Sequence, residues 1–355
     1  MKQLRFHPLN LRMEAAAVLE RLAYRGDNER CGDMRATIDF YCKKYNLERD
    51  RFSGILGAYE HVKANFVCEE HELLSLFGIP EGLEANLCDL LYQLHYNLGD
   101  ERVGDLNLRI ALILSEESDA SLFGSADAAD LLAYVQRMPI SDQEKLTFAD
   151  AIIRYDDYAA RAGSLLDQAE ALLREKADLL EPFTRHALEG WNALPNKAAF
   201  FDLLAANGLR LDSPNADVYP MAMQFTTISV HSNILSATHL GTQERTLIRY
   251  GVFVDAFTRM DQSGKTDLET IANLLHALDD KKRLQILVAL RTGPLYGQEL
   301  AGLTELSPAT VSHHMSELAG CGLVTIEKQG VKLLYHLNGA RIQEFTAKVK
   351  KNLLP

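Results

Sequence analysis

Long apolar segments are missing from this chain of 355 residues. It contains no run of about 18 apolar residues, which is the length that a membrane-spanning helix needs. The apolar stretch near the amino terminus, where a signal peptide would lie, is interrupted by charged residues such as Arg12 and Glu14. The sequence therefore argues against membrane insertion and secretion, and it predicts a cytoplasmic protein without a membrane partner.

Cysteine is scarce as well. The five cysteines form an odd set without the spacing of a disulfide framework, which is typical of reduced thiols in a cytoplasm. Cys68 and His71 could lie one helical turn apart, but a zinc site needs three or four ligands. We predict a buried structural cysteine and a surface histidine here, and no metal site.

The common catalytic and nucleotide-binding motifs are also missing. We find no G-x-G-x-x-G after a strand, no P-loop, no G-x-S-x-G and no H-E-x-x-H. Acidic pairs such as Glu116-Glu117 and Asp156-Asp157 are typical of solvated helix faces. We predict that the protein is not an enzyme and needs no cofactor, and an enzyme with an appended regulatory domain ranks third among the functions considered.

What the chain does have is an excess of acid, with a net formal charge of -12, and this excess is unevenly distributed. Residues 266–355 contain ten Lys and Arg against nine Asp and Glu, so the acidic excess belongs to the residues before them. Cations in a nearly neutral segment can cluster on one face and attract nucleic acid. The acidic total therefore does not exclude DNA binding by the carboxy-terminal segment.

The pattern of apolar residues divides the chain into three regions. Residues 1–193 show repeated helical spacing and predict a large helical domain. In residues 194–262 we expect a small α/β element and a linker, because apolar residues alternate over 219–225 and again over 248–254, and the two runs could pair. Pro220 should confine the first run to an edge strand or a strand start, and a change of parity predicts a break near Thr226. The predicted fold class is mainly α.

Residues 266–355 carry the clearest local signals, which are those of two short helices joined tightly. Asp279 and Asp280 are placed to cap one helix, and residues 296–304 predict a short one after it. Ser307 is a strong N-cap candidate, Pro308 suits the first helical position, and Gly322 can end the helix. A short helix followed closely by a well-capped one predicts a helix-turn-helix, whose second helix enters the major groove of DNA.

Two strand-like runs follow this helix, VTIEKQ and VKLLYHL, around Gln329-Gly330. Such a sequence predicts a tight hairpin. A basic hairpin after a recognition helix is a wing, and Lys328 and Lys332 lie where its tip can reach phosphate or the minor groove.

The segment with these features resembles the winged helix-turn-helix of the ArsR-type bacterial transcriptional regulators. The match to the first part of the family pattern runs through Leu278, Asp280, Arg283, Ile286 and Leu287. The match to its recognition helix runs through Ser307, Thr310, Val311, Ser312, His314, Leu318, Gly322, Leu323 and Val324. The resemblance covers about a quarter of the chain. It implies a homodimer joined through the first and last helices of this domain, which reads a palindromic operator.

The sequence departs from the metal-sensing members of the family. The helix before the recognition helix, GQELAGLTE, lacks their cysteine pair, and the last helix, RIQEFTAKVKKNLL, has no His or Asp. Metal sensing at either familiar site is therefore not expected.

The residues predicted to contact double-stranded DNA are those that packing does not require, and hydroxyls and imidazoles can bond to base edges and phosphates. They are Ser307, Thr310, Ser312, His313 and Ser316 on the recognition helix, with Lys328, Gln329 and Lys332 on the wing. His314 is expected to face inward and Cys321 to serve packing.

The predicted function is that of a sequence-specific DNA-binding regulator that responds to a small-molecule or protein effector through its amino-terminal region. The alternative is a winged-helix module for protein interaction and dimerisation that does not bind DNA.

Overall fold

The computed structural model describes residues 3–25, 32–80, 86–88, 132–133, 135–136, 140–207, 209–211, 215–233, 245–263, 267–329 and 332–353. The chain forms two compact units. Unit 1 comprises Met1–Ala193 with Pro214–Val254, and unit 2 comprises Leu194–Ser213 with Asp255–Pro355. Residues 194–262, which the sequence groups together, contribute to both units.

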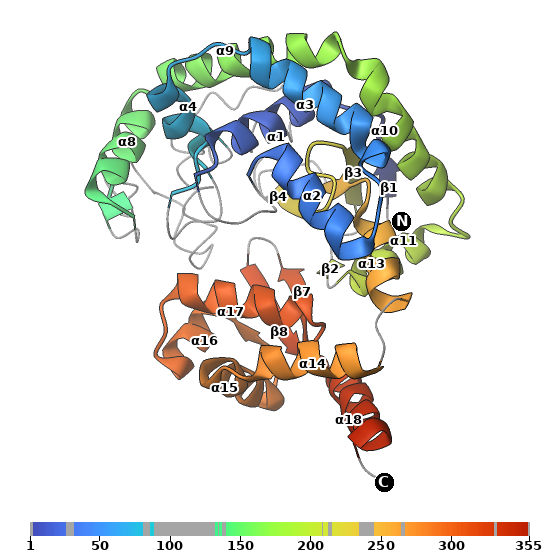
Figure 1. Ribbon diagram of the computed structural model, residues 1–355. Coiled ribbons are helices and arrows are strands. Elements are labelled where there is room, and N and C mark those ends of the chain that lie inside the picture. The colour runs from blue at the N-terminus through green and yellow to red at the C-terminus, as the bar shows by residue number, and fades with distance from the viewer. Residues whose placement is uncertain are drawn as a thin grey trace. The chain divides into compact units, whose positions relative to one another are not determined.

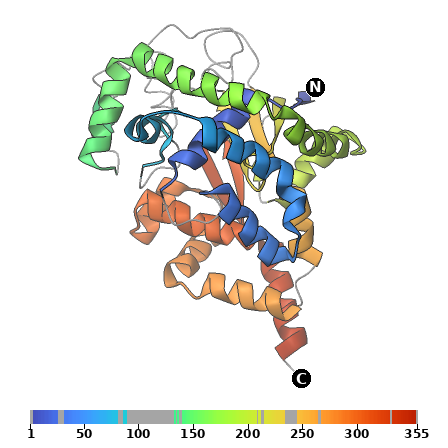
Figure 2. The ribbon, with the colours of Figure 1, turned by 45° about the horizontal axis from the view of Figure 1, so that its top comes forward.

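Most of unit 1 is helical. Its described helices are α1 (Leu11–Ala23), α2 (Met34–Tyr45), the 3-10 turn η1 (Arg49–Phe52), α3 (Ser53–Asn65), α4 (Glu70–Phe77), α8 (Asp142–Ile153), α9 (Tyr155–Arg174) and α10 (Ala177–Asn192). Helix α9 packs against α1 and α3 (Figures 1 and 2). Small side chains on α1 are part of the core of unit 1, since Ala15 and Ala17 are fully buried. The predicted mainly α fold class is confirmed.

A four-stranded sheet completes unit 1. Its strands are β1 (Gln3–Phe6), β3 (Asn215–Met221), β4 (Ile228–Asn233) and β5 (Arg245–Gly251), in the order β1-β3-β5-β4. Strands β1, β3 and β5 run parallel, and β4 runs antiparallel to β5. The two alternating runs of the sequence thus pair with each other, as predicted. The expectation for Pro220 was wrong in part, because β3 is an inner strand. Its pairing with β1 ends at Val218, however, so Pro220 is paired with β5 alone.

The predicted break near Thr226 is a turn that spans residues 222–226, between β3 and β4. A buried carboxylate holds it, because Glu14 of α1 accepts hydrogen bonds from the amides of Ala222 (2.6 Å) and Met223 (2.8 Å). Arg21 Nε donates to the Met223 carbonyl at 2.7 Å. Complete burial raises the pKa of Glu14 to about 7, although the two amides act in the opposite direction.

Unit 2 contains the predicted helix-turn-helix and wing. Its elements are α11 (Lys197–Ala206), β2 (Leu209–Leu211), α13 (Val254–Ser263), α14 (Asp267–Leu278), α15 (Lys281–Ala289), η3 (Leu290–Thr292), β6 (Leu295–Tyr296), α16 (Gly297–Thr304), α17 (Pro308–Gly320), β7 (Val324–Gln329), β8 (Lys332–Leu337) and α18 (Gly339–Leu353). The strands form a second sheet in the order β2-β7-β8-β6. Helices α14 to α17 and this sheet share one core, built from residues such as Ile286, Leu300 and Leu318.

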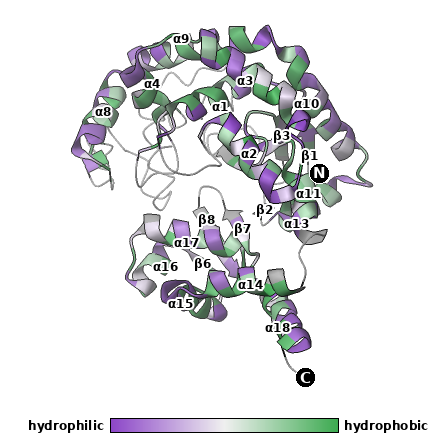
Figure 3. Ribbon diagram, in the orientation of Figure 1, coloured by the Kyte–Doolittle hydropathy of each residue, from purple (hydrophilic) through white to green (hydrophobic). Residues whose placement is uncertain are grey.

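Helix α18 differs from the other described helices of unit 2, because none of its residues is fully buried. Hydrophobic and hydrophilic residues share this helix (Figure 3). One of its sides packs against α14, and Ile342 and Phe345 lie against the core. Within the described part of the chain, no helix has the length and apolar character needed to span a membrane.

Candidate DNA-binding surface

Local hydrogen bonds fix the start of the second helix of the helix-turn-helix. Helix α16 ends at Thr304, and Glu305 adopts a left-handed conformation with φ 57° that reverses the chain. Ser307 Oγ then accepts from the amide of Thr310 at 3.1 Å and lies 2.8 Å from its hydroxyl. Pro308 takes the first turn of α17, where an amide hydrogen is not required. The predicted cap is thus present, and it sets the direction in which α17 leaves the turn.

The inner side of α17 is apolar and holds the helix in the core. Val311, Met315 and Leu318 are buried and pack with residues of α15 and α16. His314 lies on the same side and is 8% exposed, so the expectation that it faces inward is confirmed. Its Nδ1 has no hydrogen-bond partner among the described residues.

The opposite side of α17 carries the side chains predicted to reach DNA. Ser307, His313 and Ser316 are exposed, and Thr310 and Ser312 are half-buried. Four of them lie on α17 and Ser307 caps it, so they belong to one element. The helix sequence PATVSHHMSELAG contains no Lys or Arg, so these side chains can offer hydrogen bonds to bases but little charge to phosphates.

The predicted wing is the antiparallel hairpin of β7 and β8. Lys328 and Gln329 end β7, and Lys332 begins β8 opposite Gln329. All three therefore lie at the tip end of the hairpin. Their side chains and Gly330 lie outside the described residues, so contact with DNA stays a prediction.

An acidic side chain on the wing was missed by the sequence analysis. Glu327 Oε2 lies 2.6 Å from His336 Nε2 across the two strands of the hairpin. The two residues are diagonal neighbours, because Glu327 is paired with Leu334 and His336 with Thr325. Hairpin register alone could have revealed this pair, since both side chains fall on the same face of the two strands.

Two basic residues at the start of α15, Lys282 and Arg283, bind backbone carbonyls. Lys282 Nζ donates to the Thr304 carbonyl at 2.6 Å, which ties α15 to the end of α16. Arg283 Nε donates to the Ala277 carbonyl at 2.6 Å, at the end of α14. Asp280 caps α15 as predicted, and its bonds with the amides of Arg283 and Lys282 lower its pKa. These interactions position the three helices around α17.

The end of α17 is joined to α18. Gly322 has φ 73°, which is the left-handed conformation that its predicted role as a helix stop requires. Asn338 Nδ2 donates to its carbonyl at 2.9 Å, and Arg341 Nε donates to the Cys321 carbonyl at 3.4 Å. These bonds tie the end of α17 to the start of α18.

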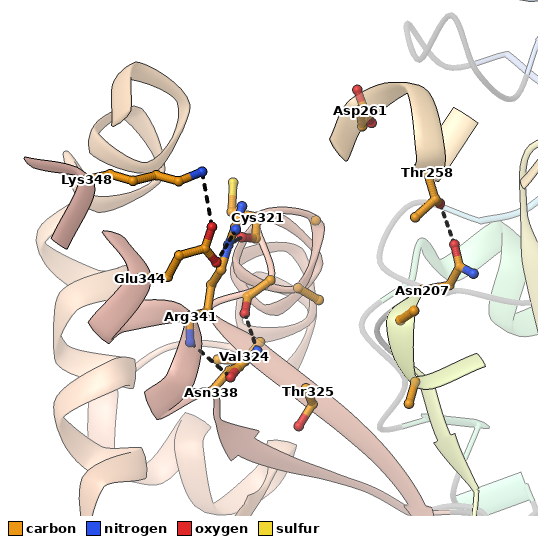
Figure 4. Close-up of a pocket in the computed structure, with 15 residues that line it drawn as sticks. Asn207, Thr258, Asp261, Cys321, Val324, Thr325, Asn338, Arg341, Glu344 and Lys348 are labelled. Atoms are coloured by element: carbon orange, nitrogen blue, oxygen red, sulfur yellow. Dashed lines mark hydrogen bonds and ion pairs between the residues drawn. The ribbon is translucent and has the colours of Figure 1, made fainter. Parts of the chain in front are cut away.

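A polar pocket of about 570 Å³ lies beside this junction, within unit 2 (Figure 4). One wall carries Arg341, Glu344 and Lys348 of α18, where Glu344 bridges the two cations at 2.7 and 3.1 Å. The other wall carries Asn207, which follows α11, and Thr258 and Asp261 of α13. Thr258 Oγ1 donates to Asn207 Oδ1 at 2.5 Å.

A pocket lined by these polar side chains can accept a small polar molecule. Sequence reasoning missed it, because its walls come from segments far apart along the chain.

No group of three or more His, Cys, Asp or Glu side chains among the described residues is arranged to hold a metal ion.

Comparison with known proteins supports a regulator of transcription. Residues 280–325 match the family model described as bacterial regulatory protein, arsR family. The chain is 37% identical over 83 residues to an arsenical resistance operon repressor of Staphylococcus xylosus, which covers 23% of this chain and 76% of the repressor. It is 38% identical over 74 residues to the repressor of the same name from Staphylococcus aureus, and this match covers 21% of this chain and 71% of that repressor.

A further relative is the HTH-type transcriptional regulator CmtR of Mycobacterium tuberculosis (strain ATCC 25618 / H37Rv), with 43% identity over 67 residues. The match covers 19% of this chain and 57% of the relative, so it spans little more than half of that regulator. The relatives match less than a quarter of the chain, and the residues that match the family model include the capped α17 and the start of β7. Through this region, the chain belongs to the arsR family of bacterial regulatory proteins, which are DNA-binding regulators of transcription.

Proposed function

We propose that this protein is a dimeric regulator that binds operator DNA through α17 and the β7–β8 wing, in the cytoplasm where bacterial DNA lies. The observation that carries the proposal is the capped α17. Its inner side is buried, and it leaves the imidazole of His313 and the hydroxyl of Ser316 exposed within a unit that matches repressors. Recognition helices of this kind read base edges with their first turns.

The dimer would form through α14 and α18. These two helices pack together, and they leave large apolar side chains exposed, namely Leu268 (58%), Leu275 (51%) and Leu353 (58%). Exposed apolar side chains grouped on neighbouring helices favour association with a second copy. A two-fold dimer would present two copies of α17 to a palindromic operator with half-sites about one helical turn apart.

The effector would act through the residues outside the family match. The polar pocket supports this role, because its walls combine Asn207, Thr258 and Asp261 with residues of α18. A polar molecule bound there would contact both the upstream segments of unit 2 and the helix that follows the wing. We therefore propose a small polar effector, while a protein partner of unit 1 is the other candidate.

Selection of duplexes from random oligonucleotides, followed by gel-shift titration, tests the function. We expect a selected duplex to bind with an affinity that falls steeply as salt rises. Replacing Ser312 and His313 together by Ala should weaken binding at least about tenfold, since a good base contact contributes about 1–3 kcal/mol. Gln285→Ala, at an exposed position of α15, is the matched control and should leave the affinity for the duplex unchanged.

The second candidate function is a winged-helix module for protein interaction and dimerisation. The absence of Lys and Arg from α17 favours it, because phosphate contacts supply much of the affinity of DNA-binding proteins. Under this function no selected duplex would emerge, and the double substitution on α17 would weaken capture of a protein instead. Unchanged operator affinity in the double variant would likewise contradict the proposed role of α17.

A further inference from the structure

The outer edge of the wing strand β7 is covered by another strand of the same chain. On one side β7 pairs with β8 in the hairpin, and on the other side it pairs with β2 in parallel. The β2 register places Leu209 opposite Ile326, Arg210 opposite Glu327 and Leu211 opposite Lys328. The sequence match to the arsR family begins at residue 280, so β2 lies outside it.

This pairing is short and made by backbone groups. An uncovered edge strand presents unpaired N–H and C=O groups, to which an extended segment can add as an extra strand. Here three residues of β2 occupy that edge near the tip of the wing. A ladder of three residues can open locally without unfolding the rest of its unit.

The start of β2 is anchored beside the polar pocket. Asn207, two residues before β2, accepts a hydrogen bond from Thr258 Oγ1 of α13 at 2.5 Å. Its Nδ2 donates to the Leu203 carbonyl of α11 at 2.9 Å. Asn207 therefore ties the entry of β2 to both α11 and α13.

Both β2 and α13, which carries Thr258, are adjacent in sequence to strands of the unit 1 sheet. Three residues separate the end of β2 at Leu211 from the start of β3 at Asn215. Strand β5 ends at Gly251, and α13 begins at Val254. Because β3 and β5 are paired neighbours, one sheet is covalently connected to both β2 and its anchor.

We propose that β2 is a strand latch on the wing, which lowers operator affinity while it is paired and is released by changes in the sheet of unit 1 or in the pocket. The proposal rests on the proposed function, since it assigns the regulation of the same DNA-binding surface. Paired strands lie about 4.8 Å apart. The backbone of Leu211 thus lies beside the backbone of Lys328. It occupies the side of the wing tip at which phosphate contact is predicted.

Two proline substitutions test the latch in the full-length chain. Consecutive strand residues direct their N–H groups to opposite edges, so Arg210→Pro and Leu211→Pro remove donors that face opposite ways. We expect one variant to speed amide exchange at residues 326–328, and the other to serve as its matched control. The opened variant should bind the selected duplex about tenfold more tightly with a steeper salt dependence, as regained phosphate contacts require.

Thr258→Val provides a second route that leaves the backbone of β2 intact. It removes the hydroxyl that holds Asn207, and it should also speed exchange at 326–328 and tighten operator binding. Agreement between this variant and the opened proline variant supports the latch even if one of the prolines impairs folding.

Several results would overturn the latch. Wild-type amides at 326–328 that exchange as fast as in both proline variants would show that β2 is not paired. Faster exchange with unchanged or weaker affinity would show that the pairing does not restrain DNA binding, while the proposed function stands. If neither the wild type nor any variant bound a selected duplex, the proposed function itself would fail, and the latch with it.

Discussion

At the scale of single residues, the capping positions carry most of what could be predicted. Ser307, Asp280 and Gly322 were each assigned from neighbouring sequence, and each occupies the expected position. Caps are predictable because they satisfy amides or carbonyls within a few residues. The partner of Glu14 was not predictable in this way, because the amides of residues 222 and 223 are more than two hundred residues away.

Ser307→Ala should destabilise the start of α17. The cap bond to the Thr310 amide is lost, and N-cap replacements of this kind cost about 1 kcal/mol. Amide exchange across residues 308–320 under increasing urea would measure the loss. Ser316→Ala is the control, since Ser316 is exposed within the helix and Ala is the better helix former. Equal losses in the two variants would contradict the capping role.

At the scale of elements, the helix-turn-helix and the hairpin could be predicted, whereas the partners of α18 could not. Its apolar residues recur at helical spacing, but this spacing does not say whether they face a core or a second molecule. In the structure α18 packs on α14 and has no fully buried residue. This incomplete burial is the reason for assigning the dimer to these two helices.

Leu275→Glu should weaken the proposed dimer. A charged side chain at the centre of an apolar interface is costly to desolvate, so we expect monomers at concentrations where the wild type is dimeric. Light scattering after size-exclusion chromatography gives the mass directly. Leu303→Glu is matched in chemistry, because Leu303 is a leucine on α16 with 64% exposure, and it should leave the mass unchanged. A dimeric Leu275 variant would place the interface elsewhere.

At the scale of the whole molecule, the two units are not two consecutive segments of sequence. The chain enters unit 2 at Leu194, returns to unit 1 at Pro214 and leaves it again at Asp255. A pattern read along the sequence groups neighbouring residues, so it could not separate residues 194–213 from the strands that follow them. The second sheet could not be predicted for the same reason, since β2 pairs with a hairpin that lies more than one hundred residues away in the sequence.

The stability of unit 1 should depend on pH through Glu14. Its pKa is raised from the ordinary 4.5 to about 7 in the folded state, so between these values the folded state binds more protons than the unfolded state. The stability contributed by this group is therefore complete below about pH 4.5 and is lost as pH rises through about 7.

Urea unfolding of unit 1, followed by amide exchange in α1 from pH 5 to pH 8, would measure this loss. Glu14→Gln should remove the dependence, while Glu48→Gln, at an exposed position, should keep it. A pH dependence that persists in the Glu14 variant would assign it to another group.

The sequence by itself determined the mainly α fold class, the helix-turn-helix, the wing and the family, because each depends on local spacing, caps and turns. Only the tertiary structure decided what surrounds them. In the tertiary structure Glu14 is buried against a turn distant in sequence, and Lys282 and Arg283 bond to backbone carbonyls. The polar pocket and the pairing of β2 with the edge of the wing are also present only there. These features join residues that are far apart in the chain, and such contacts depend on how elements pack rather than on any short pattern.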